Sequence, residues 1–250
     1  MLRGLIWAGH VGWILFLTLL TQLGGLAWLI ALRFRQRVLV FLLVYAALWG
    51  AALQIAPFFG RVALPCFGET LRAQSVFYCV TMRHFVTPEM ADVAQIAADK
   101  VAQEYPGTQT LYLDGNLPFW EGFPLIPHLS HDDGEKLDFA FFYRDAQGYL
   151  PGQTRSPIGY FAFETLEAKQ CPDAWPTMRW SLTPLQPLWS DFEVDRARTR
   201  ALTQALLNDP RVSKLFLEPP LAKDLGLSDE KLRFQGCRAA RHDDHLHLQL

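Results

Sequence analysis

The sequence predicts an α+β protein with two apolar helices at its N-terminus, and two observations lead to that prediction. Residues 4–32 and 38–59 contain no Asp, Glu, Lys or Arg. After residue 60, segments with helical periodicity and segments with strand alternation follow one another without an internal repeat. The formal net charge of −2 lacks the basic excess of nucleic-acid-binding surfaces, so we expect no nucleic-acid partner.

Each uncharged run is long enough to cross a membrane, because a helix of ~20 apolar residues spans the hydrocarbon core. The alternative is a signal peptide, which has a short apolar region followed by a small-residue cleavage site. The first run has 29 residues and a second run follows it, which fits a signal peptide poorly. We therefore expect residues 1–60 to form a two-helix transmembrane hairpin that anchors the chain in the lipid bilayer.

Arginines set the expected orientation of this hairpin. Arg33, Arg35 and Arg37 lie between the two runs, whereas the N-terminus offers only Arg3. The positive-inside rule places the arginine-rich loop in the cytoplasm, so that the N-terminus and everything after about residue 60 lie outside. In a Gram-negative cell, this means the inner (cytoplasmic) membrane, with an extracytoplasmic domain in the periplasm.

Four cysteines fall in the part of the chain that we expect outside: Cys66, Cys79, Cys171 and Cys237. An even number in an oxidising compartment is compatible with two disulfides. Three pairings are possible, and some of the cysteines could instead be buried free thiols. Pairing Cys66 with Cys79 closes the shortest loop, and pairing Cys171 with Cys237 would brace the end of the domain.

The outer part begins with residues 61–104, which we interpret as a linker followed by a helix. Residues 87–104 start with Thr87, a good N-cap, and Pro88, which suits the first helical position. An apolar stripe at helical spacing supports this helix; it consists of Met90, Val93, Ile96, Ala97 and Val101.

Residues 105–250 alternate between strand and helix signals. A second helix is expected over 195–208, where Ala201, Leu202, Ala205 and Leu206 form the apolar stripe. Pro- and Gly-rich loops are expected over 116–130 and 149–159. Strands are expected over 110–115, 137–145, 176–183, 212–221 and 245–250.

The final strand carries the first sign of chemistry. Side chains on a strand alternate between its faces, so His245 and His247 point the same way, ~7 Å apart. The leucines of the same segment point the other way and form a plausible core face. Neutral imidazole is a common zinc ligand, although two solvent-facing histidines would give the same pattern.

A second segment completes a possible metal site. Residues 128–138 read HLSHDDGEKLD, with His131 in a loop and Asp138 at the start of the aromatic-rich strand. Together with His247 they would supply three protein ligands. Three ligands and an open position characterise catalytic zinc sites, whereas structural sites have four ligands.

These two segments resemble known motifs. The pattern His131-X2-Gly134-X3-Asp138, preceded by Ser130, resembles the SxHxxGxxxD motif of the LAS-type zinc metallopeptidases, and residues 245–247 resemble their HxH motif. The resemblance is closest to the penicillin-insensitive murein endopeptidases, whose motifs read HxSHxxG and HDxHxH. It covers residues 105–250 and implies a zinc peptidase domain with a central antiparallel sheet of the LAS/hedgehog-like type.

The resemblance also implies roles for the site residues. His131, Asp138 and His247 would bind one Zn²⁺ per chain, and His245 would be the general base. Asp244 is a rival base, but strand alternation points it away from the metal unless a bulge intervenes. The remaining candidates would orient the ligands or contact substrate; they are His128, Ser130, His242 and Asp244.

The expected function is therefore a membrane-anchored zinc metallopeptidase. It would hydrolyse peptide bonds in peptidoglycan cross-links or stem peptides, as an endopeptidase or a carboxypeptidase, by metal-activated water with a histidine base. One alternative is a non-catalytic, membrane-tethered module for cell-wall binding or assembly that retains a zinc site. A second alternative is a zinc enzyme of the same fold that acts on a different amide.

Overall fold

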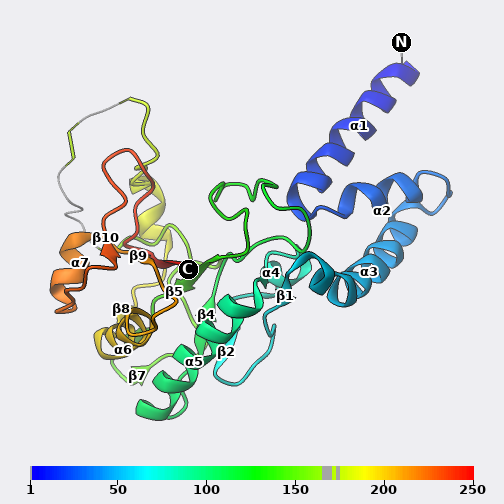
Figure 1. Cartoon of the computed structure of the whole chain (residues 1–250). Coiled ribbons are helices and arrows are strands. Elements are labelled where there is room, and N and C mark those ends of the chain that lie inside the picture. Colours follow the sequence, from blue (N-terminus) through cyan, green and yellow to red (C-terminus); the bar gives the residue numbers. More distant parts are fainter. Residues whose placement is uncertain (1, 165–170, 173–174) are drawn as a thin grey trace.

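A computed structural model of the chain describes residues 2–164, 171–172 and 175–250. It has two parts (Figure 1): an arm of apolar helices at the N-terminus, and a mixed α+β domain built around a sheet. The predicted α+β class is confirmed.

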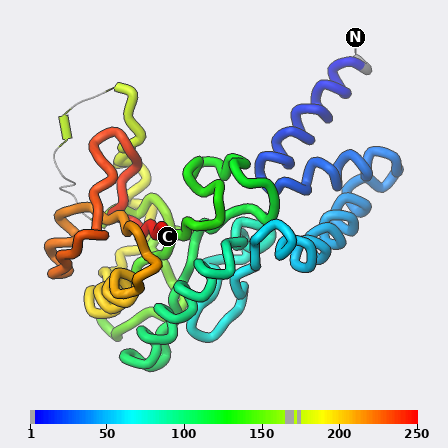
Figure 2. Tube along the Cα trace, in the orientation of Figure 1, coloured from blue at the N-terminus to red at the C-terminus, as the bar shows by residue number. Residues whose placement is uncertain are grey.

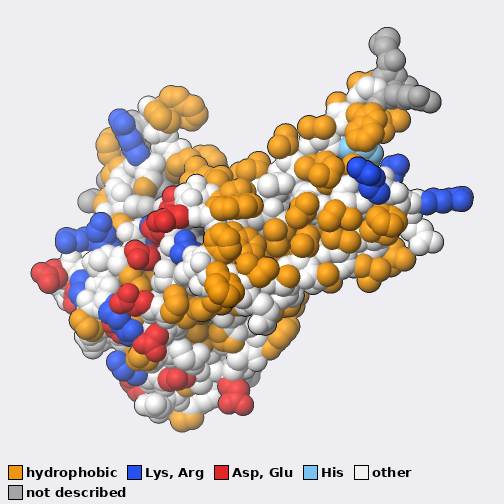
Figure 3. Space-filling view, turned by 45° about the vertical axis from the view of Figure 1, so that its right-hand side comes forward, with side chains coloured by type: hydrophobic (Ala, Val, Ile, Leu, Met, Phe, Trp, Pro, Cys, Tyr) orange, Lys and Arg blue, Asp and Glu red, His pale blue; other side chains and the backbone are white. Residues whose placement is uncertain are grey.

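The arm, residues 2–59, contains three α-helices and one 3₁₀ helix: α1 (Leu2–Thr21), α2 (Gly24–Ala31), α3 (Arg37–Ile55) and η1 (Ala56–Phe59). The stretches Gly4–Thr21 and Arg37–Phe59 are long and apolar enough to cross a membrane, by length and composition. Their hydrophobic side chains are mostly exposed and cover the visible face of the arm (Figure 3).

The first uncharged run is not a single helix. It breaks at Gln22, whose φ is +61°, and α2 then folds back against both α1 and α3. Glycine permits this close return, because a Cβ on Gly25 would lie 1.9 Å from Thr18 Oγ1. The run is uncharged but not uniformly apolar, and the break falls where Thr21 and Gln22 are followed by Gly24 and Gly25.

The two long helices both point their carboxyl ends at the sheet domain. Gln22, after α1, and Phe59, at the end of η1, both contact Phe119 of the domain. The N-terminus and the turn at residues 32–36 lie at the far end of the arm (Figure 2). This differs from the expected antiparallel hairpin, because α2 makes the return and brings the N-terminus to the same side as the arginine-rich turn.

The main sheet has six strands in the order β10-β9-β11-β5-β4-β2. The three central pairings are antiparallel, and the outer pairings β9–β10 and β2–β4 are parallel. Its strands are β2 (Leu71–Ala73), β4 (Thr110–Tyr112), β5 (Lys136–Ala140), β9 (Lys214–Phe216), β10 (Leu232–Arg233) and β11 (His245–Gln249).

Two helices, α5 (Pro88–Glu104) and α6 (Arg196–Leu207), pack against each other and contribute to the main core. Both were predicted, and both start at a side-chain cap: Thr87 accepts from the Met90 N–H, and Asp195 accepts from the Arg198 N–H. Ile96 was expected in the buried stripe of α5 but is exposed, since it lies at the solvent edge of the helix.

Other predicted strands differ from the structure. The segment 137–145 splits into β5 and β6 (Tyr143–Asp145), and β6 joins a separate sheet with β7 (Gly148–Tyr149) and β8 (Glu193–Val194). The segment 176–183, all of it described, forms no strand and leads into the 3₁₀ helix η2 (Thr183–Leu188). After β9, two prolines begin α7 (Pro219–Asp224), where their missing N–H groups are not needed.

Residues 61–86 contribute to the domain rather than forming a simple link. They contain β1 (Val62–Ala63), β2, α4 (Val76–Val80) and β3 (Phe85–Val86), and β2 is part of the main sheet. Of the three possible cysteine pairings, the structure has Cys66–Cys79 and Cys171–Cys237.

A second, smaller core joins the arm to the domain. Ala52 of α3 and Ala56 of η1 are buried against five domain residues: Met82, Phe85, Leu117, Phe119 and Leu125. Hydrogen bonds reinforce this contact, since Trp49 Nε1 donates to the Cys79 carbonyl at 2.8 Å and Tyr45 Oη donates to the Val80 carbonyl at 2.6 Å. The arm is therefore packed on the domain over an extended contact.

Candidate metal centre

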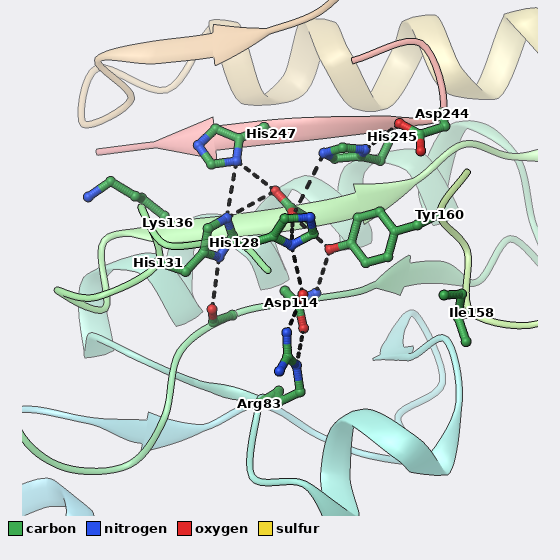
Figure 4. Close-up of polar contacts among 12 residues, drawn as sticks. Arg83, Asp114, His128, His131, Lys136, Ile158, Tyr160, Asp244, His245 and His247 are labelled. Carbon is green, nitrogen blue, oxygen red and sulfur yellow. Dashed lines mark hydrogen bonds and ion pairs between the residues drawn. The ribbon is translucent and has the colours of Figure 1, made fainter. Parts of the chain in front are cut away.

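The centre is built on the pairing of β5 with β11. The antiparallel register sets His247 opposite Asp138, while Leu246 and Leu248 of β11 point into the core. Strand alternation therefore puts His247 and Asp138 on one face of the sheet, as the sequence predicts. His131 reaches the same face from the loop that precedes β5 (Figure 4).

The predicted ligand atoms converge. His131 Nε2 lies 3.1 Å from His247 Nδ1 and 3.4 Å from Asp138 Oδ1, and His247 Nδ1 lies 2.8 Å from Asp138 Oδ1. Zinc ligands at ~2.0–2.1 Å in tetrahedral geometry lie roughly 3.3 Å from one another. The three side chains are buried, and their spacing fits a single small cation.

The second polar atom of each ligand is also engaged. His131 Nδ1 donates to the Gly115 carbonyl at 2.8 Å, which leaves the lone pair on Nε2 for a metal. Asp138 Oδ2 accepts from the Tyr160 hydroxyl at 2.6 Å, and His247 Nε2 lies 3.0 Å from the Gln249 side-chain amide. Such partners fix the orientation of metal ligands and tune their affinity.

His245 forms a pair with Asp244. Asp244 Oδ1 lies 2.5 Å from His245 Nδ1, and its other oxygen accepts from the Phe161 N–H at 2.6 Å. The Nε2 atom of His245 points toward the ligands and lies 3.8 Å from Asp138 Oδ2. Asp244 precedes β11, and its carboxylate is bonded to His245 and to the Phe161 N–H rather than to the candidate ligands.

A buried network supports the site from below. His128 Nδ1 lies 2.7 Å from Asp114 Oδ2 and 3.5 Å from Asp138 Oδ2. Arg83 donates two hydrogen bonds to Asp114, at 2.5 and 2.8 Å, and so holds that carboxylate beneath His128. Since His128 also lies within 4.8 Å of His131 and Asp138, it belongs to the same group of potential ligands.

The site opens into a cavity of about 310 Å³. His242 lines it and is 5 % exposed, and its Nδ1 has no hydrogen-bond partner among the described residues. Ser130 is exposed at the rim. Lys136, two residues before Asp138, pairs with Asp133 and points away from the ligand side chains (Figure 4).

Charges in the site act differently on the three candidate ligands. Burial lowers the pKa of His131, but Asp138 outweighs it and raises the pKa, which favours the protonated imidazole. Burial raises the pKa of Asp138, but His131, His245 and His247 hold it well below its usual value, so the carboxylate is ionised. Burial lowers the pKa of His247 to about 4, which keeps this imidazole neutral. Burial also lowers the pKa of His245, but Asp244 and Asp138 outweigh it and raise the value to about 9.

Sequence reasoning missed Arg83, Asp114 and Tyr160. Asp114 follows strand β4 and precedes Gly115, and a carboxylate at a strand end was the signal that identified Asp138. Arg83 and Tyr160 carry no comparable signal, because their contacts cross 31 and 22 residues of sequence.

In the same cavity, His242, His245 and His247 form a further group whose nitrogens lie within 4.8 Å of one another, and a third group of metal-binding residue types lies elsewhere. Cys66, Cys79 and His84 come within 4.8 Å of one another, but the two sulfurs form a disulfide. That bond leaves no thiolate to act as a ligand.

No family model matches the chain, and no curated protein matches it. The assignment of the centre therefore rests on its own residues and geometry.

Proposed function

We propose that the protein is a membrane-anchored zinc metallopeptidase that hydrolyses peptide bonds in peptidoglycan cross-links or stem peptides. One observation carries the proposal: the donor atoms of His131, Asp138 and His247 lie within 3.4 Å of one another at the wall of a cavity. The substrate class comes from the motif resemblance to the LAS-type zinc metallopeptidases.

In this proposal His131, Asp138 and His247 hold the zinc ion. Bound there, zinc would supply a Lewis acid for a substrate carbonyl and for the activation of water. Asp138 contributes the single negative charge among the three ligands, and Tyr160 keeps its second oxygen engaged. The Gly115 carbonyl keeps the His131 ring in the tautomer with a free Nε2.

His245 is suited to move the proton. Asp244 holds its Nδ1, so its Nε2 can accept a proton from water and later donate it to the leaving amine. The pKa of about 9 arises partly from Asp138. A divalent cation beside that carboxylate would cancel part of its effect and lower the pKa of His245 toward neutral pH.

The alternative is a non-catalytic, membrane-tethered wall-binding or assembly module that retains a zinc site. The His245–Asp244 pair favours the enzyme, because a module that only binds has no need for an oriented proton carrier beside three ligands. A zinc enzyme acting on another amide would share the same centre, and only substrate assays distinguish that possibility.

We further propose that the arm spans the inner membrane with the domain outside. Two disulfides support an oxidising compartment for the domain. Since α1 and α3 both point toward the domain, the N-terminus would lie with Arg33, Arg35 and Arg37 in the cytoplasm. A reporter active only in the cytoplasm should work at the N-terminus, and its failure there would overturn this topology.

The central test uses the full chain purified in detergent and incubated with isolated peptidoglycan. Mass spectrometry of the released muropeptides should show hydrolysed peptide bonds and should distinguish endopeptidase from carboxypeptidase products. Removal of zinc by a chelator should stop the reaction, and added zinc should restore it. Zinc-loaded protein that releases no product would favour the non-catalytic alternative.

A further inference from the structure

One loop of the domain, residues 117–129, contacts both the arm and the metal-site cavity. Residues 117–129 connect β4 to the segment that carries His131, and they are rich in aromatic and proline residues. Three apolar side chains of this loop are exposed: Trp120 at 55 %, Ile126 at 51 % and Leu129 at 62 %. Leu129 also lines the metal-site cavity beside His128 and His131.

The same loop is fastened to the arm. The Phe119 N–H donates to Gln22 Oε1 at 2.9 Å, and the Phe119 carbonyl accepts from Gln22 Nε2 at 3.4 Å. The Phe119 ring packs edge-on against Phe59, with centroids 5.1 Å apart. Because the loop also buries Ala52 and Ala56, it lies beside the last turns of α3 and η1.

This contact fixes the height of the loop relative to a membrane. A helix rises about 1.5 Å per residue, so ~20 residues cross a hydrocarbon core of ~30 Å. Counted from Arg37, this thickness reaches the end of α3. Because Tyr45 and Trp49 bond to α4 partway along α3, α4 lies at the depth of the hydrocarbon, where its exposed apolar side chains would meet lipid; they are Val76, Phe77 and Val80. The loop packs against that end, and its exposed apolar residues therefore lie at the level where aromatic side chains concentrate in membrane proteins.

We propose that loop 117–129 docks on the surface of the bilayer, with Trp120, Ile126 and Leu129 seated among the lipid headgroups. The proposal rests on the membrane anchorage proposed above. The loop contains no Lys or Arg, and its one Asp or Glu is the exposed Glu121, so its attachment is apolar and does not require anionic lipid. Since Leu129 lines the cavity, the metal site opens beside the membrane surface.

Tryptophan quenching tests this docking without using activity. The full chain and its Trp120→Phe variant are reconstituted in phosphatidylcholine vesicles, with and without lipids brominated on their acyl chains near the headgroup. The emission lost in the variant reports Trp120 alone, and brominated lipid should quench more than about half of it, as expected for a residue of the interfacial belt.

Two further variants serve as controls for the quenching of Trp120. Tyr105→Trp adds a reporter after α5, at the end of the domain away from the arm (Figure 1), and its added emission should not be quenched. Leu129→Trp reports the other end of the loop and should be quenched. Quenching of the arm tryptophans without quenching at positions 120 and 129 would overturn the docking and leave the anchor intact. Absence of quenching everywhere would overturn the anchor itself.

Discussion

Two regions of the molecule bring together side chains of types that can bind metals. They differ in whether those side chains still have lone pairs available for a metal ion. In the cavity on β5 and β11, the histidines and Asp138 keep unshared lone pairs directed at a common point, while their other atoms are held by partners. Beside α4, Cys66 and Cys79 have used their sulfurs in a bond, and His84 lies against the rings of Trp49 and Phe85. Proximity alone therefore does not make a metal site.

The largest effect should come from removing a ligand. His131→Ala should lower zinc from about one ion per chain to almost none and abolish peptide hydrolysis, because two remaining ligands cannot hold a three-ligand site. Elemental analysis of the full chain measures this. The matched control is His84→Ala, which should keep its zinc. A His131→Ala variant that also kept zinc would show that His131 is not a ligand.

The next effect concerns the proton carrier. His245→Ala should retain zinc but lower kcat by about 10²–10⁴-fold, the usual contribution of a general acid–base group. Asp244→Asn should retain zinc with a smaller loss, because it only misorients the imidazole. Loss of zinc in His245→Ala would make that residue a ligand and contradict its assignment as the base.

A third effect concerns the hydrogen-bond partners that orient the candidate ligands. Tyr160→Phe removes the 2.6 Å hydrogen bond to Asp138 Oδ2 and should weaken zinc binding by about 10–100-fold. Competition with a zinc-binding dye measures this affinity. Tyr149→Phe removes a hydroxyl bonded to the Gln109 carbonyl, away from the centre, and should leave the affinity unchanged; equal losses in both variants would indicate a general effect on folding.

The disulfide region should show the reverse pattern. Replacing Cys66 and Cys79 by serine should reduce the free energy of unfolding by about 2–3 kcal/mol, because the bond closes a short loop in the unfolded chain. The zinc content should not change. Denaturation of the full chain in detergent measures the first quantity, and a fall in zinc content would mean that the two regions are coupled.

The smallest expected effect comes from a difference in pKa between two buried carboxyl groups, Asp138 and Glu164. Histidines keep Asp138 ionised, whereas burial of Glu164, opposed by Arg155, raises its pKa to about 7. A raised folded-state pKa means that the contribution of Glu164 to stability is present below pH 4.5 and is lost as the pH rises through about 7.

Glu164→Gln tests this sign. The variant should gain about 2 kcal/mol relative to the wild type between pH 5 and pH 8, measured by thermal unfolding at both values. A constant difference between the two proteins across this range would show that Glu164 does not titrate there.

The candidate ligands could be predicted because each of the two segments that carry them has a recognisable local pattern, although His131 and Asp138 meet His247 across 116 and 109 residues. Strand alternation alone places His245 and His247 on one face, and the spacing of His131 and Asp138 matches a known motif. The helices α5 and α6 could be predicted for a similar reason, since Thr87 and Asp195 cap them from within the sequence.

The remaining features depend on contacts between distant segments. The support of His128 by Asp114 and Arg83 arises only when three loops meet, and no spacing in the sequence encodes it. The predicted strand over 176–183 was wrong because strand propensity without a neighbouring strand to pair with does not form a sheet. The return of α2 begins at Gln22 and Gly24-Gly25, which signal a break in the helix but do not encode the direction in which the chain then runs.

The small core shared by Ala52, Ala56, Leu117, Phe119 and Leu125 has a practical consequence. The arm packs against the domain at this core. A fragment that starts at residue 61 would therefore expose the apolar side chains of Leu117, Phe119 and Leu125, in the loop that leads to His131. Such a fragment should aggregate or bind zinc poorly even though every ligand is present. The candidate metal centre is best studied with the arm attached.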